Sequence, residues 1–189
     1  MKHHHYACYK PPGYLSQFIY EGKRKATKKL LGELYDFAPK TMAIGRLDEA
    51  SEGLLLLTTD GKISEAIRSS QYQKEYYVQL DGKITIQAIE QLKKGVVIGF
   101  FGKKYTTKPC EAKELSTLDP YPIQARKVRS DSKRGTSWIG ITISEGKFRQ
   151  VRKMTAAVGF PTLRLVRVRI GAIELTQNSG EVTVLESLV

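Results

Sequence analysis

The chain has 189 residues, of which 41% are hydrophobic and 26% are charged, as is typical of a globular protein rather than a disordered chain. Its longest apolar run, Leu54 to Leu57, is much shorter than the ~18 residues that a membrane-spanning helix needs, and Met1 to His5 lack the apolar core of a signal peptide. The formal net charge of +12 favours a polyanionic partner, with nucleic acid as the first candidate.

The N-terminal part is predicted to contain a strand and then a helix. Tyr6 to Tyr9 is a short extended run that ends at Pro11-Pro12-Gly13. Thr27 is expected to cap a helix that ends before Pro39 and buries one apolar face, made of Leu30, Leu31, Leu34 and Phe37.

Two strands and a helix are predicted next. Gly53 to Thr59 is apolar enough for a buried strand, which turns at Asp60-Gly61. Ile63 to Ser69 is expected to form a short helix. Tyr76, Val78 and Leu80 alternate with more polar neighbours, which is the period of a strand.

The C-terminal half is predicted to mix strands and helices. Thr85 to Lys94 is an amphipathic helix with Ile86, Ile89 and Leu92 inward, whereas Val96 to Ser132 gives no clear pattern. Lys147 to Val158 is predicted as a helix. The last predicted strands are Ser137 to Ile143, Arg164 to Ile170 and Glu181 to Leu185. Because strands outnumber helices and neighbours are close in sequence, we expect an α+β fold with a mixed, mainly antiparallel sheet flanked by helices and loops.

Two sequence features suggest chemistry. Most of the positive charge falls in Gln124 to Arg169, which favours nucleic acid over a generally basic surface. Residues 45–61, GRLDEASEGLLLLTTDG, place Asp48 in a loop directly before the predicted buried strand. Asp48 there is suited to act as nucleophile, base or metal ligand, and the alternative is a loop aspartate paired with Arg46.

The same stretch resembles, over its whole length, the catalytic motif of the RsuA-type ribosomal RNA pseudouridine synthases, GRLDxxSEGLLLLTxDG. Further segments resemble motifs of this family in order and spacing, namely Lys10 to Gly13, Lys74 to Val78, Gly95 to Pro109, Glu145 to Met154 and Phe160 to Arg167. Two residues depart from the pattern, Lys153 in place of a second Arg and Cys110 in place of Ala.

The resemblance also implies a branch and a substrate. Many relatives carry an RNA-binding S4 domain, but here the lysine-proline motif at Lys10 lies within ten residues of the start. The chain therefore resembles the short, RluE-like branch, whose implied substrate is a uridine of 23S ribosomal RNA. We expect residues 1–189 to form a single catalytic domain without an S4 domain, with two closely packed subdomains as an alternative.

The resemblance assigns the catalytic role to Asp48. Tyr76 is implied to stack on the target base and to serve as general base at C5, although a buried ring alone would also explain its position. Arg152 is our candidate to pair with Asp48, because a helical wheel places it at the edge of the apolar face.

An RNA-binding role is expected for seven basic residues. Arg46 would fill the space that a flipped base leaves, and the others would hold phosphates: Lys147, Arg149, Lys153, Arg164, Arg167 and Arg169. The reaction requires no cofactor and no metal. We expect a monomer. A cytoplasmic setting is expected because Cys8 and Cys110 have no disulfide or metal-site spacing. His3 to His5 are assigned no function, whether metal ligands, a tag or a disordered end.

Two rival functions remain at this stage. The first is a non-catalytic RNA-binding or ribosome-assembly protein, which explains the basic residues but not Asp48 together with Tyr76 and Arg152. The second is a metal-dependent nuclease that clusters the carboxylates Asp48, Glu49, Glu52 and Asp60 around Mg²⁺.

Overall fold

A computed structural model describes residues 2–23, 27–69, 72–128 and 134–188. The helices are η2, a 3-10 turn (Leu31–Glu33), α1 (Gly61–Arg68), α2 (Ile86–Lys94) and α3 (Gln150–Ala157). The strands are β1 (His5–Lys10), β2 (Met42–Ala43), β3 (Glu52–Thr58), β4 (Lys74–Asp81), β5 (Val97–Phe100), β6 (Lys103–Thr106), β7 (Glu111–Leu115), β8 (Thr136–Ile143), β9 (Thr162–Ile170), β10 (Ile173–Glu174) and β11 (Val182–Leu185).

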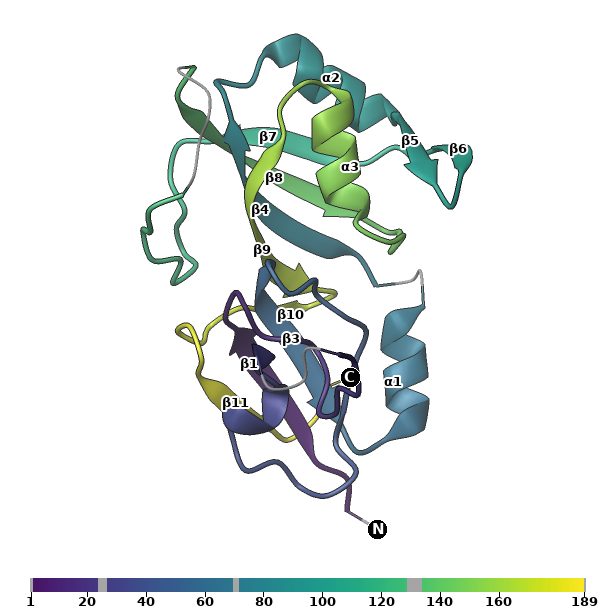
Figure 1. The fold of residues 1–189 in the computed structure, drawn as a ribbon, viewed down its shortest axis with the longest axis vertical. Helices are drawn as coiled ribbons and strands as arrows, with labels where there is room; N and C mark the ends of the chain where they lie inside the picture. Colours follow the sequence, from purple (N-terminus) through teal and green to yellow (C-terminus); the bar gives the residue numbers. More distant parts are fainter. Residues whose placement is uncertain (1, 24–26, 70–71, 129–133, 189) are drawn as a thin grey trace.

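One long sheet runs through the molecule in the order β11-β1-β3-β9-β4-β8-β7 (Figure 1). The β3–β9 ladder is parallel, and the other ladders of this sheet are antiparallel. Helices α2 and α3 lie beside the β4–β8–β7 end, and α1 lies beside the β3 end (Figure 1). The predicted α+β class with a mixed, mainly antiparallel sheet is confirmed.

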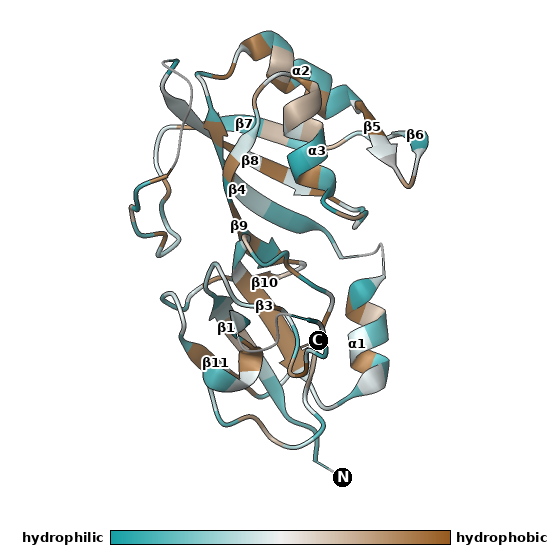
Figure 2. Ribbon diagram, viewed as in Figure 1, coloured by the Kyte–Doolittle hydropathy of each residue, from teal (hydrophilic) through white to brown (hydrophobic). Residues whose placement is uncertain are grey.

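Strand β3 is buried on both faces, which explains its unbroken leucine run. Leu54 and Leu56 pack with β9 in one apolar cluster, and Leu55 and Leu57 pack with β1 and η2 in another. A third cluster lies between β4, β8 and the helices α2 and α3. Figure 2 shows the apolar residues concentrated along β3, β8 and β9.

The close parallel contact between β3 and β9 depends on a glycine. Gly53 has φ 101° and lies opposite Arg167 in the ladder. A Cβ at Gly53 would come within 2.4 Å of the Arg167 backbone oxygen, which no side-chain-bearing residue tolerates. The glycine therefore fixes how β9 lies against the strand that follows the Asp48 loop.

The predicted strands are confirmed, and so are the helices now labelled α1 and α2, which begin at side-chain caps. Asp60 accepts hydrogen bonds from the backbone of Lys62 and Ile63, and Thr85 accepts one from Ala88. One detail is wrong, because Ile86 is 78% exposed and the inner face of α2 is formed by Ala88, Ile89 and Leu92. Ile86 stands in the first turn, before the helix meets its neighbours.

Two other predicted helices need correction. The stretch after Thr27 forms only the 3-10 turn η2, because its apolar side chains pack separately around β1, as the edge-to-face rings of Phe37 and Tyr6 illustrate. Helix α3 begins at Gln150 instead of Lys147. Phe148 is consequently 60% exposed and does not belong to the apolar face.

The region without a clear pattern contains the hairpin β5–β6 and the edge strand β7. At the N-terminus, His5 belongs to β1 and hydrogen-bonds Thr58 at 2.9 Å, so a disordered end, one of the alternatives left open for His3 to His5, does not apply to this residue. Within the described part of the chain, no helix is both long and apolar enough to cross a bilayer.

Candidate active site

Asp48 lies in the loop between β2 and β3, and its backbone oxygen accepts a hydrogen bond from the Ser51 backbone at 3.0 Å. The tight turn at Asp48–Ser51 leads directly into the buried strand β3. The Asp48 side chain keeps 23% of its surface exposed, while Ser51 and Leu47 are buried. The Asp48 carboxylate is therefore partly exposed between two buried residues that anchor the loop in the core.

A buried lysine, Lys10, anchors this loop. The Lys10 ammonium donates hydrogen bonds to the backbone oxygens of Pro11 at 2.8 Å and Tyr14 at 2.7 Å, and a longer one to Glu49 at 3.4 Å. Burial lowers the pKa of Lys10 to about 8. Ser16 adds a second anchor, since its hydroxyl bonds both the N–H and the oxygen of Leu47.

Two arginines of one segment reach the Asp48 carboxylate. An Arg149 Nη1 donates to Asp48 Oδ2 at 3.2 Å, and Arg152 Nε lies 3.7 Å from the same oxygen. Arg152 also donates to the Ser51 hydroxyl at 3.0 Å. The predicted proximity of Arg152 to Asp48 is confirmed, but the hydrogen-bonded partner is Arg149, which the sequence had suggested only for phosphate binding.

The loop before α3 is positioned by a buried carboxylate, Glu145. It accepts hydrogen bonds from the hydroxyl of Tyr105, the backbone of Lys108 and the side chain of Gln150. Gln150 in turn accepts a hydrogen bond from the Lys147 backbone at 3.0 Å. Arg149 has a left-handed backbone with φ 52° at the start of α3, which is uncommon outside glycine. The loop so positioned brings Arg149 to Asp48, whereas the Lys147 ammonium lies over the Tyr105 ring, 5.2 Å from its centre.

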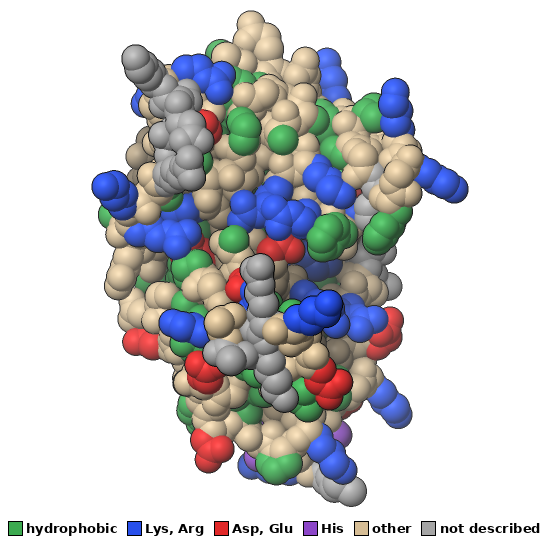
Figure 3. All heavy atoms as spheres, viewed as in Figure 1, with side chains coloured by type: hydrophobic (Ala, Val, Ile, Leu, Met, Phe, Trp, Pro, Cys, Tyr) green, Lys and Arg blue, Asp and Glu red, His purple; other side chains and the backbone are tan. Residues whose placement is uncertain are grey.

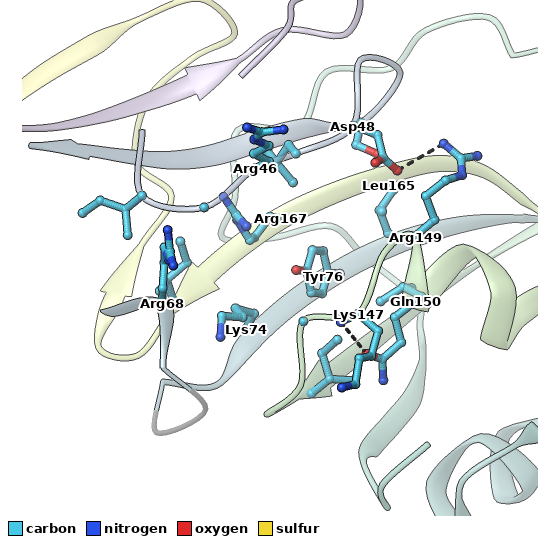
Figure 4. Close-up of a pocket in the computed structure, with 18 of the residues that line it drawn as sticks. Arg46, Asp48, Arg68, Lys74, Tyr76, Lys147, Arg149, Gln150, Leu165 and Arg167 are labelled. Carbon is cyan, nitrogen blue, oxygen red and sulfur yellow. Dashed lines mark hydrogen bonds and ion pairs between the residues drawn. The ribbon is translucent and has the colours of Figure 1, made fainter. Parts of the chain in front are cut away.

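Tyr76 lies on β4, directly across from Arg167 of β9. Its ring is buried in the apolar cluster with Val78 and Leu80, as the strand alternation predicts. One side of the ring still faces a cavity, and Lys74 lies two residues before it on the same face of the strand. Figure 4 shows Tyr76 between Asp48 and Lys74.

These residues share one cavity of about 490 Å³. Asp48 is the only acidic side chain in its wall as described, and the basic ones are Arg46, Arg68, Lys74, Lys147, Arg149 and Arg167 (Figure 4). Apolar side chains such as Leu165 and Val151 complete the wall. A cavity with one carboxylate, one aromatic ring and a surplus of cations is suited to hold part of an anionic polymer against a reactive carboxylate.

Only some of the seven basic residues expected to bind RNA lie on the surface. Arg46, Lys147 and Arg149 are exposed at the cavity, and Lys153 is partly exposed, with its ammonium bonded to the Gly99 oxygen. Residues 129–133, which belong to the basic stretch of the sequence, lie outside the described residues.

The phosphate-binding role predicted for three arginines of β9 does not fit where the structure places them. Arg164 is 3% exposed and forms a two-point ion pair with Glu52 at 3.0 and 3.2 Å, so a phosphate role does not fit its burial. Arg169 is half-buried and pairs with Glu75 at 2.9 Å. Arg167 is buried within the cavity wall. The acids that pair with Arg164 and Arg169 come from β3 and β4, and no local pattern of β9 indicates these partners.

The carboxylates proposed for a nuclease do not converge. Glu52 is inside the core with Arg164, Glu49 pairs with Lys28, and Asp60 caps α1 beyond the far end of β3. Among the residues that the structure describes, no three His, Cys, Asp or Glu side chains form a group suited to a metal ion. Asp48 therefore stands apart from the other acids of its own motif.

Sequence reasoning missed four cavity residues. Lys74, Arg68, Ser51 and Leu165 line or support the site without having been singled out. Lys74 was detectable, since it precedes Tyr76 by two residues on the same strand face. The others depend on which strands become neighbours, which no local pattern reveals.

Comparison with known proteins agrees with this geometry. The family model for RNA pseudouridylate synthase matches residues 4–157. The chain belongs to this family, so the predicted class, an isomerase that modifies RNA, is confirmed. It is 40% identical over 173 residues to ribosomal large subunit pseudouridine synthase E of Xanthomonas campestris, covering 88% of this chain and 86% of the relative.

Other relatives give the same result. Ribosomal large subunit pseudouridine synthase E of Vibrio parahaemolyticus is 41% identical over 172 residues, covering 88% of this chain and 66% of the relative. A crystal structure of a pseudouridylate synthase matches with a TM-score of 0.75 at 26% identity, covering 97% of this chain and 70% of that one. The resemblance to the RluE-like branch of the family is thus confirmed.

Proposed function

We propose that this protein converts a uridine of large-subunit ribosomal RNA into pseudouridine, with Asp48 as the catalytic carboxylate. The observation that carries the proposal is that Asp48 is the one acidic side chain among the described residues of a basic cavity that also holds Tyr76. The substrate follows from the two relatives at 40% and 41% identity, which are both named for the large ribosomal subunit.

The reaction needs three things from the protein. The bond between uracil N1 and the sugar C1′ must break, the base must turn, and C5 must bond to C1′ while its proton leaves. Asp48 would attack the sugar at C1′, attack the base at C6, or remove a sugar proton, and each route requires an ionised carboxylate. Arg149 and Arg152 lie 3.2 and 3.7 Å from Asp48 Oδ2 and would orient the carboxylate for this step.

Tyr76 would carry the base during this exchange. Its ring faces the cavity, so a flipped uracil has a flat apolar surface to stack on. Its hydroxyl is suited to take the C5 proton. Arg46, which is exposed at the cavity rim, would fill the gap left in the RNA stack, and Lys147, Arg149 and Lys153 would hold phosphates.

The surface supports an RNA partner. Figure 3 shows Lys and Arg side chains gathered across the middle of one face, at the level where β9 connects the β3 half of the long sheet to the β4 half in Figure 1. We further propose that residues 1–189 act as one catalytic domain, as a monomer, in the cytoplasm and without a cofactor. The free thiols of Cys8 and Cys110 are compatible with a reducing compartment.

Pseudouridine mapping tests this function. Ribosomal RNA from cells with the gene and from cells lacking it should differ at one uridine of the large subunit. The purified protein should restore that site in RNA from the deficient cells, in the presence of EDTA, and Asp48→Asn should not. Identical maps in the two cell lines would refute the substrate, and activity that EDTA abolishes would refute a metal-free reaction.

A further inference from the structure

The deep wall of the cavity holds an arginine with unused hydrogen-bonding capacity. Arg167 is 4% exposed, and its Nε donates to the backbone oxygen of Leu54 at 2.8 Å. One of its terminal nitrogens, Nη2, is buried and has no hydrogen-bond partner among the described residues. A buried charged donor left unpaired is costly, so its position against a cavity indicates a ligand.

A second cation lies beside it. Lys74 is half-buried in the same wall, and burial, with a further contribution from Arg167, lowers the pKa of Lys74. Both side chains flank Tyr76, Lys74 two residues earlier on β4 and Arg167 opposite on β9. In Figure 4 the hydroxyl end of Tyr76 points to the side on which Arg167 and Lys74 lie, while Asp48 lies on the other side of the ring.

These two cations lie deeper in the cavity than its exposed basic residues. Arg46, Lys147 and Arg149 are exposed at the rim, where an RNA backbone can reach them. The base is the part of a flipped nucleotide that enters a pocket furthest. A base stacked on Tyr76 therefore meets Arg167 and Lys74, whereas its phosphates stay with the rim.

The chemistry of the base explains why cations belong there. When the N1–C1′ bond breaks, its electron pair stays with uracil, and the base carries a negative charge shared by N1, C5, O2 and O4. When C5 bonds to C1′, the base supplies that electron pair, C5 then loses its proton and N1 gains one. Attack at C6 also places negative charge on O4.

We propose that Arg167 and Lys74 form an anion-stabilising site for the uracil base, donating to its carbonyl oxygens while the N1–C1′ bond is broken. This inference rests on the proposed function, since it assigns two more residues to the same reaction. Donors placed in advance where charge develops are among the strongest means by which enzymes lower barriers.

The test compares two bases that differ in their stability as anions. Fluorine at C5 withdraws electron density, so 5-fluorouracil leaves more easily than uracil. Two ribosomal RNA fragments are used, one with uridine and one with 5-fluorouridine at the target site. Each fragment is mixed with an excess of the parent protein, of the Lys74→Met variant or of the Lys94→Met variant. Single-turnover loss of the N-linked nucleoside is followed by chromatography of nuclease digests, and affinity is measured by RNA binding.

Lys74→Met should slow the uridine reaction on the order of tenfold to a hundredfold. The loss should be several-fold smaller with 5-fluorouridine, and affinity should change less than twofold. Lys94→Met removes an exposed lysine at the end of α2 and should match the parent. Equal losses on both bases, or a loss of affinity with an unchanged single-turnover rate, would overturn the proposal.

Arg167 is tested with its conservative variant, because its bond to Leu54 also supports the β3–β9 contact. Arg167→Lys retains the charge and should keep more activity than Arg167→Met at equal thermal stability. If the two folded variants react equally fast, the charge of Arg167 has no role. Should the parent form no pseudouridine in any ribosomal RNA, the proposed function fails first, whereas an active parent with a fully active Lys74→Met refutes only this inference.

Discussion

Asp48 and Glu52 stand four residues apart in one motif, yet the fold gives them opposite environments. Glu52 is 3% exposed and is held by Arg164 at 3.0 and 3.2 Å, by Tyr9 at 3.0 Å and by Arg126 at 3.2 Å. Asp48 faces a cavity and has one hydrogen bond from Arg149, with Arg152 at 3.7 Å.

The difference teaches how one sequence stretch divides its tasks. A fully paired buried carboxylate has no oxygen lone pairs left for a substrate and serves the fold. A carboxylate with few partners, beside a cavity, keeps oxygen lone pairs available for a substrate. The number and geometry of partners, rather than the residue type, distinguish the proposed catalytic acid from the structural one.

Asp48→Asn should give the largest effect and acts on turnover alone. The amide keeps the shape but removes the negative charge, so we expect the rate of pseudouridine formation to fall on the order of 10⁴-fold or more. Unfolding in urea should stay within about 1 kcal/mol of the parent, because the side chain is partly exposed. Near-parent turnover by the purified variant would contradict the assignment of Asp48.

Glu52→Gln should show the opposite pattern. It leaves Arg164 buried without its counter-ion, so the free energy of unfolding should fall by about 3–5 kcal/mol. Urea titration checks this value, and the folded fraction should retain turnover. If Glu52→Gln is as stable as the parent but inactive, Glu52 and not Asp48 is the chemical acid of the motif.

Arg152→Ala sharpens the description of Asp48. Removing this side chain takes away a positive charge 3.7 Å from Asp48 Oδ2 and the donor to the Ser51 hydroxyl, so the carboxylate loses one of its two cationic neighbours. We expect the single-turnover rate at neutral pH to fall by roughly 10- to 100-fold with little change in RNA affinity. A pure loss of affinity with an unchanged single-turnover rate would move Arg152 to the phosphate-binding surface.

Lys10→Met tests how Lys10 stabilises the Asp48 loop, through the pH dependence of the free energy of unfolding. Burial lowers the pKa of Lys10 to about 8, so between pH 8 and the ordinary lysine value the unfolded chain binds more protons than the folded one. The stability contribution of this group therefore rises with pH in that window. The destabilisation caused by Lys10→Met should be on the order of 1–2 kcal/mol larger at pH 9.5 than at pH 7.5. Denaturation of both proteins at the two pH values measures it, and a pH-independent difference would contradict the burial of a charged Lys10.

Arg149→Ala should produce the smallest change. Arg149 is expected to hold a phosphate when RNA is bound, so the slope of log affinity against log salt should become shallower by about 0.7. Arg68→Ala offers a comparison at the opposite side of the cavity, where the arginine pairs with Glu65 on its own helix. An unchanged slope in Arg149→Ala would leave Arg149 as a partner of Asp48 only.

The sequence by itself determined most of the elements and the family, and it predicts the reactive acid. Local periodicity and caps sufficed for β3, β4 and α2, because those signals act over a few residues. The GRLDEASEGLLLLTTDG stretch singled out Asp48 through its resemblance to a family motif, and so did Lys74 to Val78 for Tyr76, whose burial alone follows from strand alternation.

Only the tertiary structure decided which charges meet. Arg164 points inward to Glu52, and Arg167 lines the cavity with Lys74. Arg149 contacts Asp48, although the two residues are 101 positions apart in the sequence. Such pairings depend on strand neighbours and register, in this case on the parallel contact of β9 with β3 at Gly53. A basic side chain has the same local pattern whether it faces water, a buried acid or a substrate, so the fold alone separates these roles.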